Sequence, residues 1–130
     1  MKILLAACNA KYIHSNLAVF NLKAYAKEYD SQVVLREYTI NQLKDDILKD
    51  IYRCHPDVVC VSCYIWNITF VRELMQDLRK ILPDVPFWAG GPEVSYDAET
   101  FLGKNPAFNG VMVGEGEETF LELVKHYVDG

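Results

Sequence analysis

The chain has 130 residues, of which 51% are hydrophobic, and a formal net charge of -5 at pH 7. This length suits one domain with its own core, so residues 1–130 are expected to form a single domain. The acidic balance, without a cluster of Lys and Arg, argues against nucleic acid or an anionic membrane as a partner. No apolar run is long enough for a signal or membrane-spanning segment, so the chain is expected to be cytoplasmic.

Short apolar runs alternate with helical patterns along the whole chain. The runs predict strands over residues 2–8, 33–38, 58–63, 86–90 and 110–114. In Asn67–Leu82, apolar residues recur at the spacing of one helix face and Pro83 then ends the helix; Thr39 and Gln42 match a capping box for the preceding helix. Five such βα units predict an α/β fold with a parallel sheet covered by helices on both faces.

The order of the strands follows from their composition. The first and third runs are almost entirely apolar, as central strands are, whereas the second carries Arg36 and Glu37 and suits an edge. This favours a flavodoxin-like doubly wound sheet in the order 2-1-3-4-5. Ligands of such sheets bind beyond the carboxyl ends of the strands, so the loops after strands one, three, four and five are the candidates for a site.

The loop after the first strand, residues 9–16, lacks three known signatures. It has no clustered aspartates for magnesium, no GxGxxG for a dinucleotide and too few Ser, Thr and Gly residues to hold the phosphate of FMN. His14 is the one side chain there that could bind a metal or titrate near pH 7; the alternative is a turn histidine that packs on Tyr12.

The four cysteines are expected to be reduced thiols. Cys60 and Cys63 form a CxxC, but no second pair accompanies them, so zinc or redox use is disfavoured.

Aromatic residues and glycines mark the remaining loops. Tyr64 and Trp66, after the third strand, could stack on a flat ring, cover the core or form an interface. Gly90 and Gly91 allow close approach to the backbone. One glycine usually suffices for a turn, so the second is expected to serve a ligand, and valine at either position should remove the ligand but not the fold.

The loop after the fifth strand contains Gly114, Glu115 and Gly116, followed by Glu117 and Glu118. The last two suit a first helical turn, where the helix dipole favours carboxylates. Three acids would repel a polyphosphate. The expected ligand is therefore large, weakly charged and recognised by backbone groups.

Together the segments NAKYIHSNLA, VSCYIWN, GGPEVS and VGEGEETF resemble the cobalamin (B12)-binding domain of B12-dependent radical S-adenosylmethionine (SAM) proteins. The resemblance spans residues 2 to about 128 and implies cobalamin as the cofactor. It implies that Ser62, Gly90 and Gly91 line the path of the nucleotide tail, and that Gly114, Glu115 and Gly116 meet the corrin edge or the tail. The implied cofactor-binding residues are Asn9, Tyr12, His14, Ser62, Tyr64, Trp66, Gly90, Gly91, Pro92, Glu93, Gly114, Glu115 and Gly116.

One departure concerns cobalt. Related domains carry DxHxxG after the first strand, with the His as cobalt ligand, but here Tyr12 stands at the Asp and Leu17 at the Gly of that motif. The carboxylate that would orient His14 is missing. No protein imidazole is therefore expected below cobalt, and Tyr12, Tyr64 or Trp66 is expected to face it.

The second departure is the absence of a CxxxCxxC motif, which in the family lies in a following barrel. The chain is therefore expected to be the N-terminal domain of a longer protein, to bind without catalysing, and to have the radical SAM barrel as its partner. The full-length protein would use a [4Fe-4S] cluster and SAM for methyl transfer or a related radical reaction. The alternatives are a domain for another planar cofactor such as FMN, and a ligand-free sensor or interaction scaffold that uses Tyr64 and Trp66.

Overall fold

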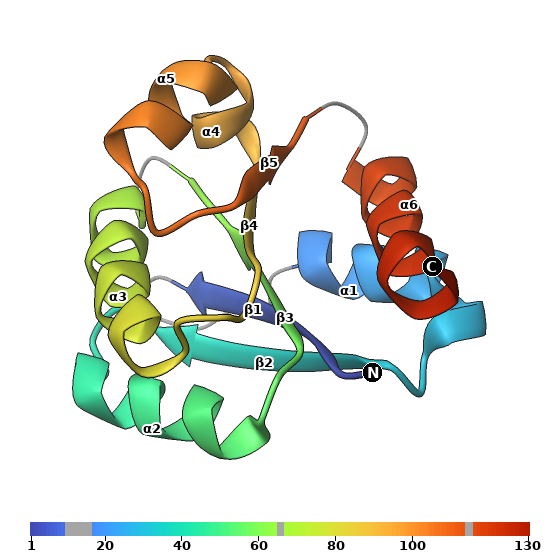
Figure 1. Ribbon diagram of the computed structural model, residues 1–130, viewed down its shortest axis with the longest axis horizontal. Helices are drawn as coiled ribbons and strands as arrows, with labels where there is room; N and C mark the ends of the chain where they lie inside the picture. Colours follow the sequence, from blue (N-terminus) through green and yellow to red (C-terminus); the bar gives the residue numbers. More distant parts are fainter. Residues whose placement is uncertain (10–16, 65–66, 114–115) are drawn as a thin grey trace.

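The computed structural model describes residues 1–9, 17–64, 67–113 and 116–130 (Figure 1). The strands are β1 (Ile3–Asn9), β2 (Val33–Thr39), β3 (Val58–Ser62), β4 (Phe87–Gly90) and β5 (Gly110–Met112). The helices are α1 (Leu17–Tyr25), a 3-10 turn η1 (Lys27–Tyr29), α2 (Lys44–Cys54), α3 (Ile68–Ile81), α4 (Pro92–Ser95), α5 (Ala98–Lys104) and α6 (Gly116–Asp129).

The strands form one parallel sheet in the order β2-β1-β3-β4-β5. This order confirms the flavodoxin-like prediction. All residues of β1 and β3 are buried, whereas Arg36 and Glu37 of the edge strand β2 are exposed. The physical basis of the prediction, that central parallel strands are apolar on both faces, therefore holds in this sheet.

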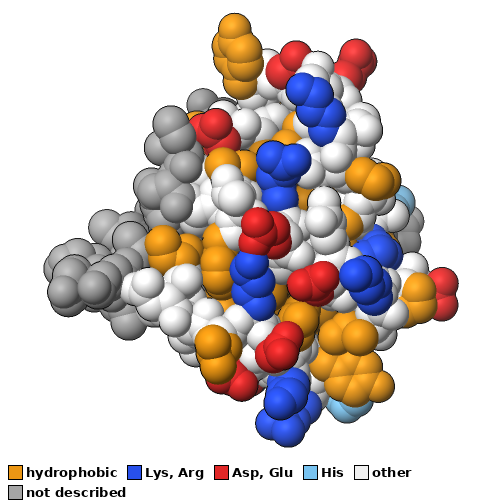
Figure 2. Space-filling view, turned by 90° about the vertical axis from the view of Figure 1, so that its left-hand side faces the viewer, with side chains coloured by type: hydrophobic (Ala, Val, Ile, Leu, Met, Phe, Trp, Pro, Cys, Tyr) orange, Lys and Arg blue, Asp and Glu red, His pale blue; other side chains and the backbone are white. Residues whose placement is uncertain are grey.

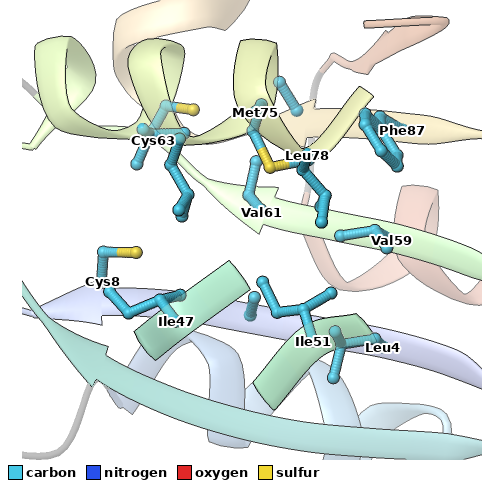
Figure 3. Close-up of a cluster of buried hydrophobic side chains, with 14 of the residues drawn as sticks. Leu4, Cys8, Ile47, Ile51, Val59, Val61, Cys63, Met75, Leu78 and Phe87 are labelled. Atoms are coloured by element: carbon cyan, nitrogen blue, oxygen red, sulfur yellow. The ribbon is translucent and has the colours of Figure 1, made fainter. Parts of the chain in front are cut away.

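Alternate residues of the strands point to opposite faces of the sheet and form two separate hydrophobic cores. Leu4, Val59 and Val61 point to one face and pack against α2 and α3, whereas Ile3 and Leu5 point to the other face. Figure 3 shows the first cluster, with Ile47 and Ile51 of α2 and Met75 and Leu78 of α3 converging on the sheet. Helices α1 and α6 cover the second face (Figure 1).

The helix predicted over Asn67–Leu82 is confirmed as α3, with Asn67 and Leu82 as its flanking residues. The predicted capping box is wrong. The side chain of Gln42 accepts a hydrogen bond from the backbone N–H of Thr39 (2.7 Å), but these residues form a turn at the end of β2. Helix α2 begins later, after Leu43.

Arg79 joins α3 to the segments that enter β4 and β5. Its guanidinium group donates to the carbonyl oxygens of Val85 (2.7 Å) and Ala107 (2.7 Å) and lies 3.8 Å from the centre of the Phe87 ring. Burial lowers the pKa of this group. Because these contacts lie where β4 and β5 begin, they stabilise the end of the sheet opposite to the strand-end loops.

All four cysteines are free and buried, as predicted for reduced thiols. Cys60 and Cys63 belong to different cores, on opposite faces of the sheet, so their CxxC spacing does not form a pair. Burial raises the pKa of Cys8, Cys60 and Cys63 to about 12. Within the described ranges, no group of His, Cys, Asp and Glu side chains is arranged to hold a metal ion.

Figure 2 shows acidic and basic side chains interspersed with hydrophobic ones on the side of the molecule that carries α2 and α3. This face therefore has no continuous patch of one charge. Among the described residues, no helix is both long and apolar enough to span a bilayer.

Candidate functional site

A cavity of about 450 Å³ lies at the carboxyl ends of β3, β4 and β5, where the topology of the sheet places a ligand. Helices α1, α4 and α6 contribute its walls. The residues that line it are Asn21, Leu22, Ser62, Tyr64, Gly90, Gly91, Pro92, Ser95, Met112, Gly116 and Glu117. A larger groove of about 560 Å³ lies on the outer surface, lined by residues of α2 and Ile81, but no strand end reaches it.

Gly91 is required by the fold itself. Its φ of +104° is a conformation that L side chains rarely adopt, and a Cβ atom there would lie 2.4 Å from the carbonyl oxygen of Cys63. The expectation that valine at Gly91 would spare the fold therefore does not suit this geometry. Close packing of two strand-end segments, rather than a ligand, already explains this glycine.

Gly90 is constrained much less. A Cβ atom there would meet only the side chain of Met112, whose Cε lies at 3.0 Å and can move. Both residues line the cavity, so a side chain at Gly90 would enter space that the fold leaves open. Of the two glycines, only Gly91 is thus explained by the fold alone.

Helix α4 begins directly after Gly91, with Pro92 in its first turn. Proline suits this place because its fixed φ is already helical and the first turn needs no donor from it. The hydroxyl group of Ser95 donates to the carbonyl oxygen of Gly91 (2.8 Å) and closes the turn. The GGPEVS segment is therefore a strand end followed by a single helical turn that walls the cavity.

Asn67 joins the ends of β1 and β3 on the floor of the site. Its side-chain N–H group donates to the carbonyl oxygens of Cys8 (3.0 Å) and Ser62 (3.2 Å). Its side-chain oxygen accepts from the backbone N–H of Tyr64 (2.8 Å), and the residue is 1% exposed. One buried amide thus fixes the backbone on both sides of the point where the strand order reverses.

The structure brings together six of the residues proposed from the sequence: Ser62, Tyr64, Gly90, Gly91, Pro92 and Gly116. Two others do not line the cavity. The side chain of Asn9 is buried and donates to Glu37 on β2 (3.2 Å), and Glu93 is exposed on α4. Tyr12, His14, Trp66, Gly114 and Glu115 lie outside the described residues.

Five lining residues were not singled out from the sequence as cofactor-binding: Asn21, Leu22, Ser95, Met112 and Glu117. Asn21 and Leu22 lie within a helix whose pattern gives no sign of a site. Met112 fits the pattern of a strand, and a glutamate at position 117 suits the first turn of a helix. Only Ser95, inside the GGPEVS segment, carried a signal that could have identified it.

The polar part of the lining is almost entirely neutral. Hydroxyl and amide groups come from Ser62, Tyr64, Ser95 and Asn21, and among the described lining residues Glu117 is the only charged one. With no Lys or Arg in this lining, the cavity suits a neutral ligand group held by hydrogen bonds and contact with the backbone.

A doubly wound parallel sheet with a largely uncharged cavity at its strand ends defines a cofactor-binding domain of the flavodoxin-like class. The model of the B12 binding domain family matches residues 3–124. The chain belongs to this family, which confirms the resemblance found in the sequence.

Two curated relatives are methyltransferases. The cobalamin-dependent radical SAM methyltransferase TokK of Streptomyces tokunonensis is 31% identical over 111 residues, which cover 79% of this chain and 15% of TokK. A 2-(S-pantetheinyl)-carbapenam-3-carboxylate methyltransferase of Streptantibioticus cattleyicolor is 33% identical over 69 residues, 53% of this chain and 10% of that protein. The chain thus spans less than a fifth of the length of these relatives.

Two solved structures share the fold. The radical SAM enzyme OxsB with aqua-cobalamin and SAM bound has a TM-score of 0.75 at 16% identity, over 98% of this chain and 19% of OxsB. A cobalamin-binding protein from Desulfitobacterium hafniense DCB-2 has a TM-score of 0.62 at 13% identity, over 98% of this chain and 59% of that protein.

Proposed function

We propose that the strand-end cavity holds the nucleotide tail of cobalamin, while the corrin ring lies over the carboxyl ends of the strands. The observation that carries this proposal is the bare backbone at Gly90 in a cavity whose described lining has no Lys or Arg, in a chain of the B12 binding domain family. A corrinoid is broad, bears many amides and has one phosphate, so it calls for close contact and hydrogen bonds more than for charge.

The dimensions of the cavity support a bound tail. Its volume of about 450 Å³ falls in the range of small-molecule sites but is small for a whole corrinoid. The hydroxyl group of Ser62 makes no hydrogen bond to another described residue and is available to a ligand. Asn21 supplies both a donor and an acceptor on the opposite wall.

The role of this chain is to bind and orient. Cobalamin, when bound, supplies a cobalt centre that can carry a methyl group. Gly90 and Gly91 allow the ligand to reach the backbone, and Asn67 holds the strand ends that form the floor. Asn9, Tyr12, His14, Trp66, Glu93, Gly114 and Glu115 stay predicted cofactor contacts from the resemblance.

The test of binding is to mix the purified chain with hydroxocobalamin, remove free corrinoid by desalting and record the visible spectrum. We expect corrinoid to be retained. FMN treated in the same way should be lost, because its phosphate is a doubly charged monoester and the described lining offers no cation, whereas the tail of cobalamin carries a singly charged phosphodiester. A chain that is folded by circular dichroism and retains no corrinoid would contradict the proposal.

We also propose that His14 does not ligate cobalt, since the sequence lacks the carboxylate that would orient it. The expected result is that His14→Ala leaves the cobalt-sensitive bands of the bound corrinoid unchanged. A shift of these bands in the variant would show that the imidazole is a ligand.

For the full-length protein, we propose a radical SAM domain that follows this module and uses a [4Fe-4S] cluster and SAM for methyl transfer or a related radical reaction. The support is the similarity to TokK, a protein of which this chain covers 15%. The proposal predicts a CxxxCxxC motif in the coding sequence downstream of this module. A complete reading frame without such a motif would contradict it.

A further inference from the structure

Glu117 is the only charged side chain among the described residues that line the cavity. It lies in the first turn of α6 and is half-buried. It makes no hydrogen bond or ion pair with any other residue that the structure describes. Glu117 thus lines the cavity, and no Lys or Arg among the described residues pairs with its carboxylate.

The helix dipole does not account for this placement. Glu118, the next residue, lies in the same first turn and gains the same stabilisation, but it is exposed and does not line the cavity. The two glutamates therefore differ in what they can contact rather than in their position on the helix. Glu118 is a natural control for Glu117.

The chemistry of the carboxylate limits what it can meet. An ionised carboxylate only accepts hydrogen bonds, so it attracts O–H and N–H donors and repels a phosphate. In the nucleotide tail of cobalamin, the sugar carries free hydroxyl groups, whereas the base offers no N–H group. The sugar is thus the part of the tail that a carboxylate can bind, as acidic residues bind ribose hydroxyls in other doubly wound folds.

We propose that Glu117 accepts a hydrogen bond from a sugar hydroxyl group of the tail and makes the domain selective for corrinoids that carry a nucleotide. This inference rests on the proposed function. Helix α1 supports the placement, because Leu22 lies at van der Waals distance from Gly116, with its Cδ2 atom 3.5 Å from the position of an added Cβ. Helices α1 and α6 thus pack against each other beside the cavity, and each contributes a polar lining residue, Asn21 and Glu117.

The experiment compares two corrinoids that differ by the tail. Hydroxocobalamin has the nucleotide, whereas cobinamide lacks it but keeps the corrin ring and its amides. The dissociation constant of each is measured by spectroscopic titration for the wild-type chain, Glu117→Ala, Glu117→Gln and Glu118→Ala. Urea unfolding of each variant shows that the protein titrated is folded.

We expect Glu117→Ala to weaken hydroxocobalamin binding by about tenfold or more, because a hydrogen bond to a charged group is lost. Glu117→Gln should lose less, since an amide oxygen still accepts a weaker bond. Cobinamide binding should not change in either variant, and Glu118→Ala should bind both corrinoids as the wild type does.

Three results would overturn the inference while leaving the proposed function intact. If Glu117→Ala weakens the binding of both corrinoids equally, Glu117 contacts the corrin and not the tail. If its affinity for hydroxocobalamin is unchanged, Glu117 makes no contact with the ligand. If Glu118→Ala loses as much affinity, the effect comes from the charge at the start of the helix. A wild-type chain that binds neither corrinoid would instead overturn the proposed function, and this inference with it.

Discussion

At the scale of single residues, Gly90 and Gly91 are glycine for different reasons. Gly91 has a left-handed backbone and no space for a Cβ atom beside Cys63, whereas Gly90 faces the movable side chain of Met112 and the cavity. The first constraint acts in the folded protein without a ligand. The second is weaker, because a shift of the Met112 side chain relieves it.

This difference predicts opposite outcomes for two alanine variants. Gly91→Ala should lower the free energy of unfolding by about 2–3 kcal/mol, from strain at positive φ and the clash with the Cys63 carbonyl group. Gly90→Ala should cost less than about 1 kcal/mol in stability but weaken corrinoid retention. Urea unfolding and desalting with hydroxocobalamin measure the two effects. Equal stability of the two variants would contradict the assignment.

At the scale of elements, the buried side chain of Asn67 connects the ends of β1 and β3 to the start of α3. Three hydrogen bonds of one amide satisfy backbone groups that no strand neighbour reaches, because pairing of β1 with β3 ends at Ala6 and Val61. The resulting floor holds Ser62 and Tyr64 where both line the cavity. A polar residue in the core here serves the geometry of the site.

Asn67→Ala should therefore reduce stability by about 2–4 kcal/mol, since it leaves buried backbone groups without partners and opens a small void. It should also weaken hydroxocobalamin binding at temperatures where the variant is fully folded. Thermal unfolding followed by titration at a lower temperature measures both. Binding at wild-type strength in the folded variant would show that Asn67 serves stability alone.

The elements themselves were largely predictable. Every predicted strand is present with its ends shifted by two residues at most, and the helix over Asn67–Leu82 forms as expected. The capping box at Thr39 failed because the same spacing also suits a turn. The segment between β4 and β5 divides into α4 and α5, where the side chain of Asp97 caps the second helix.

At the scale of the whole molecule, the sheet separates two cores, and buried thiols lie in both. Cys8 and Cys63 lie on one side and Cys60 lies on the other. Burial keeps these thiols protonated in the folded chain, with the pKa of each raised to about 12. In the unfolded chain a thiol has its ordinary pKa of about 8.5.

Stability should therefore fall in alkaline solution. Below about pH 8.5 the thiols are protonated in both the folded and the unfolded chain, so their contribution to stability is complete. Between about pH 8.5 and 12 only the unfolded chain releases these protons. In that range each thiol lowers the free energy of unfolding by up to about 1.4 kcal/mol per pH unit. Tyr38, whose pKa is raised by burial and by its hydrogen bond to Asp50, acts in the same direction.

Urea unfolding at pH 7, 9 and 10.5 measures this loss. Cys60→Ala should reduce the alkaline slope, because one buried thiol is removed, even though the variant is less stable at pH 7. A midpoint that stays constant from pH 7 to pH 10.5 would contradict the assignment of the thiols.

The sequence by itself determined the fold class, the strand order and the family. These follow from local patterns: apolar runs that only a central parallel strand tolerates, helix-face spacing, and loop motifs at fixed places along the chain. It also identified the loops after β3, β4 and β5, because parallel strands bring their carboxyl ends to one edge.

Only the tertiary structure decided which side chains share the cavity. Asn9 lies in a candidate loop but turns to Glu37 on the edge strand, whereas Asn21 and Glu117 enter from helices that pack against each other. The sequence predicted that the second glycine serves a ligand, but in the structure Gly91 is the one that the fold itself requires. The clash that a side chain at Gly91 would cause is with Cys63, which is distant in sequence. Contacts between distant segments depend on how the elements pack, and local sequence patterns do not predict that packing.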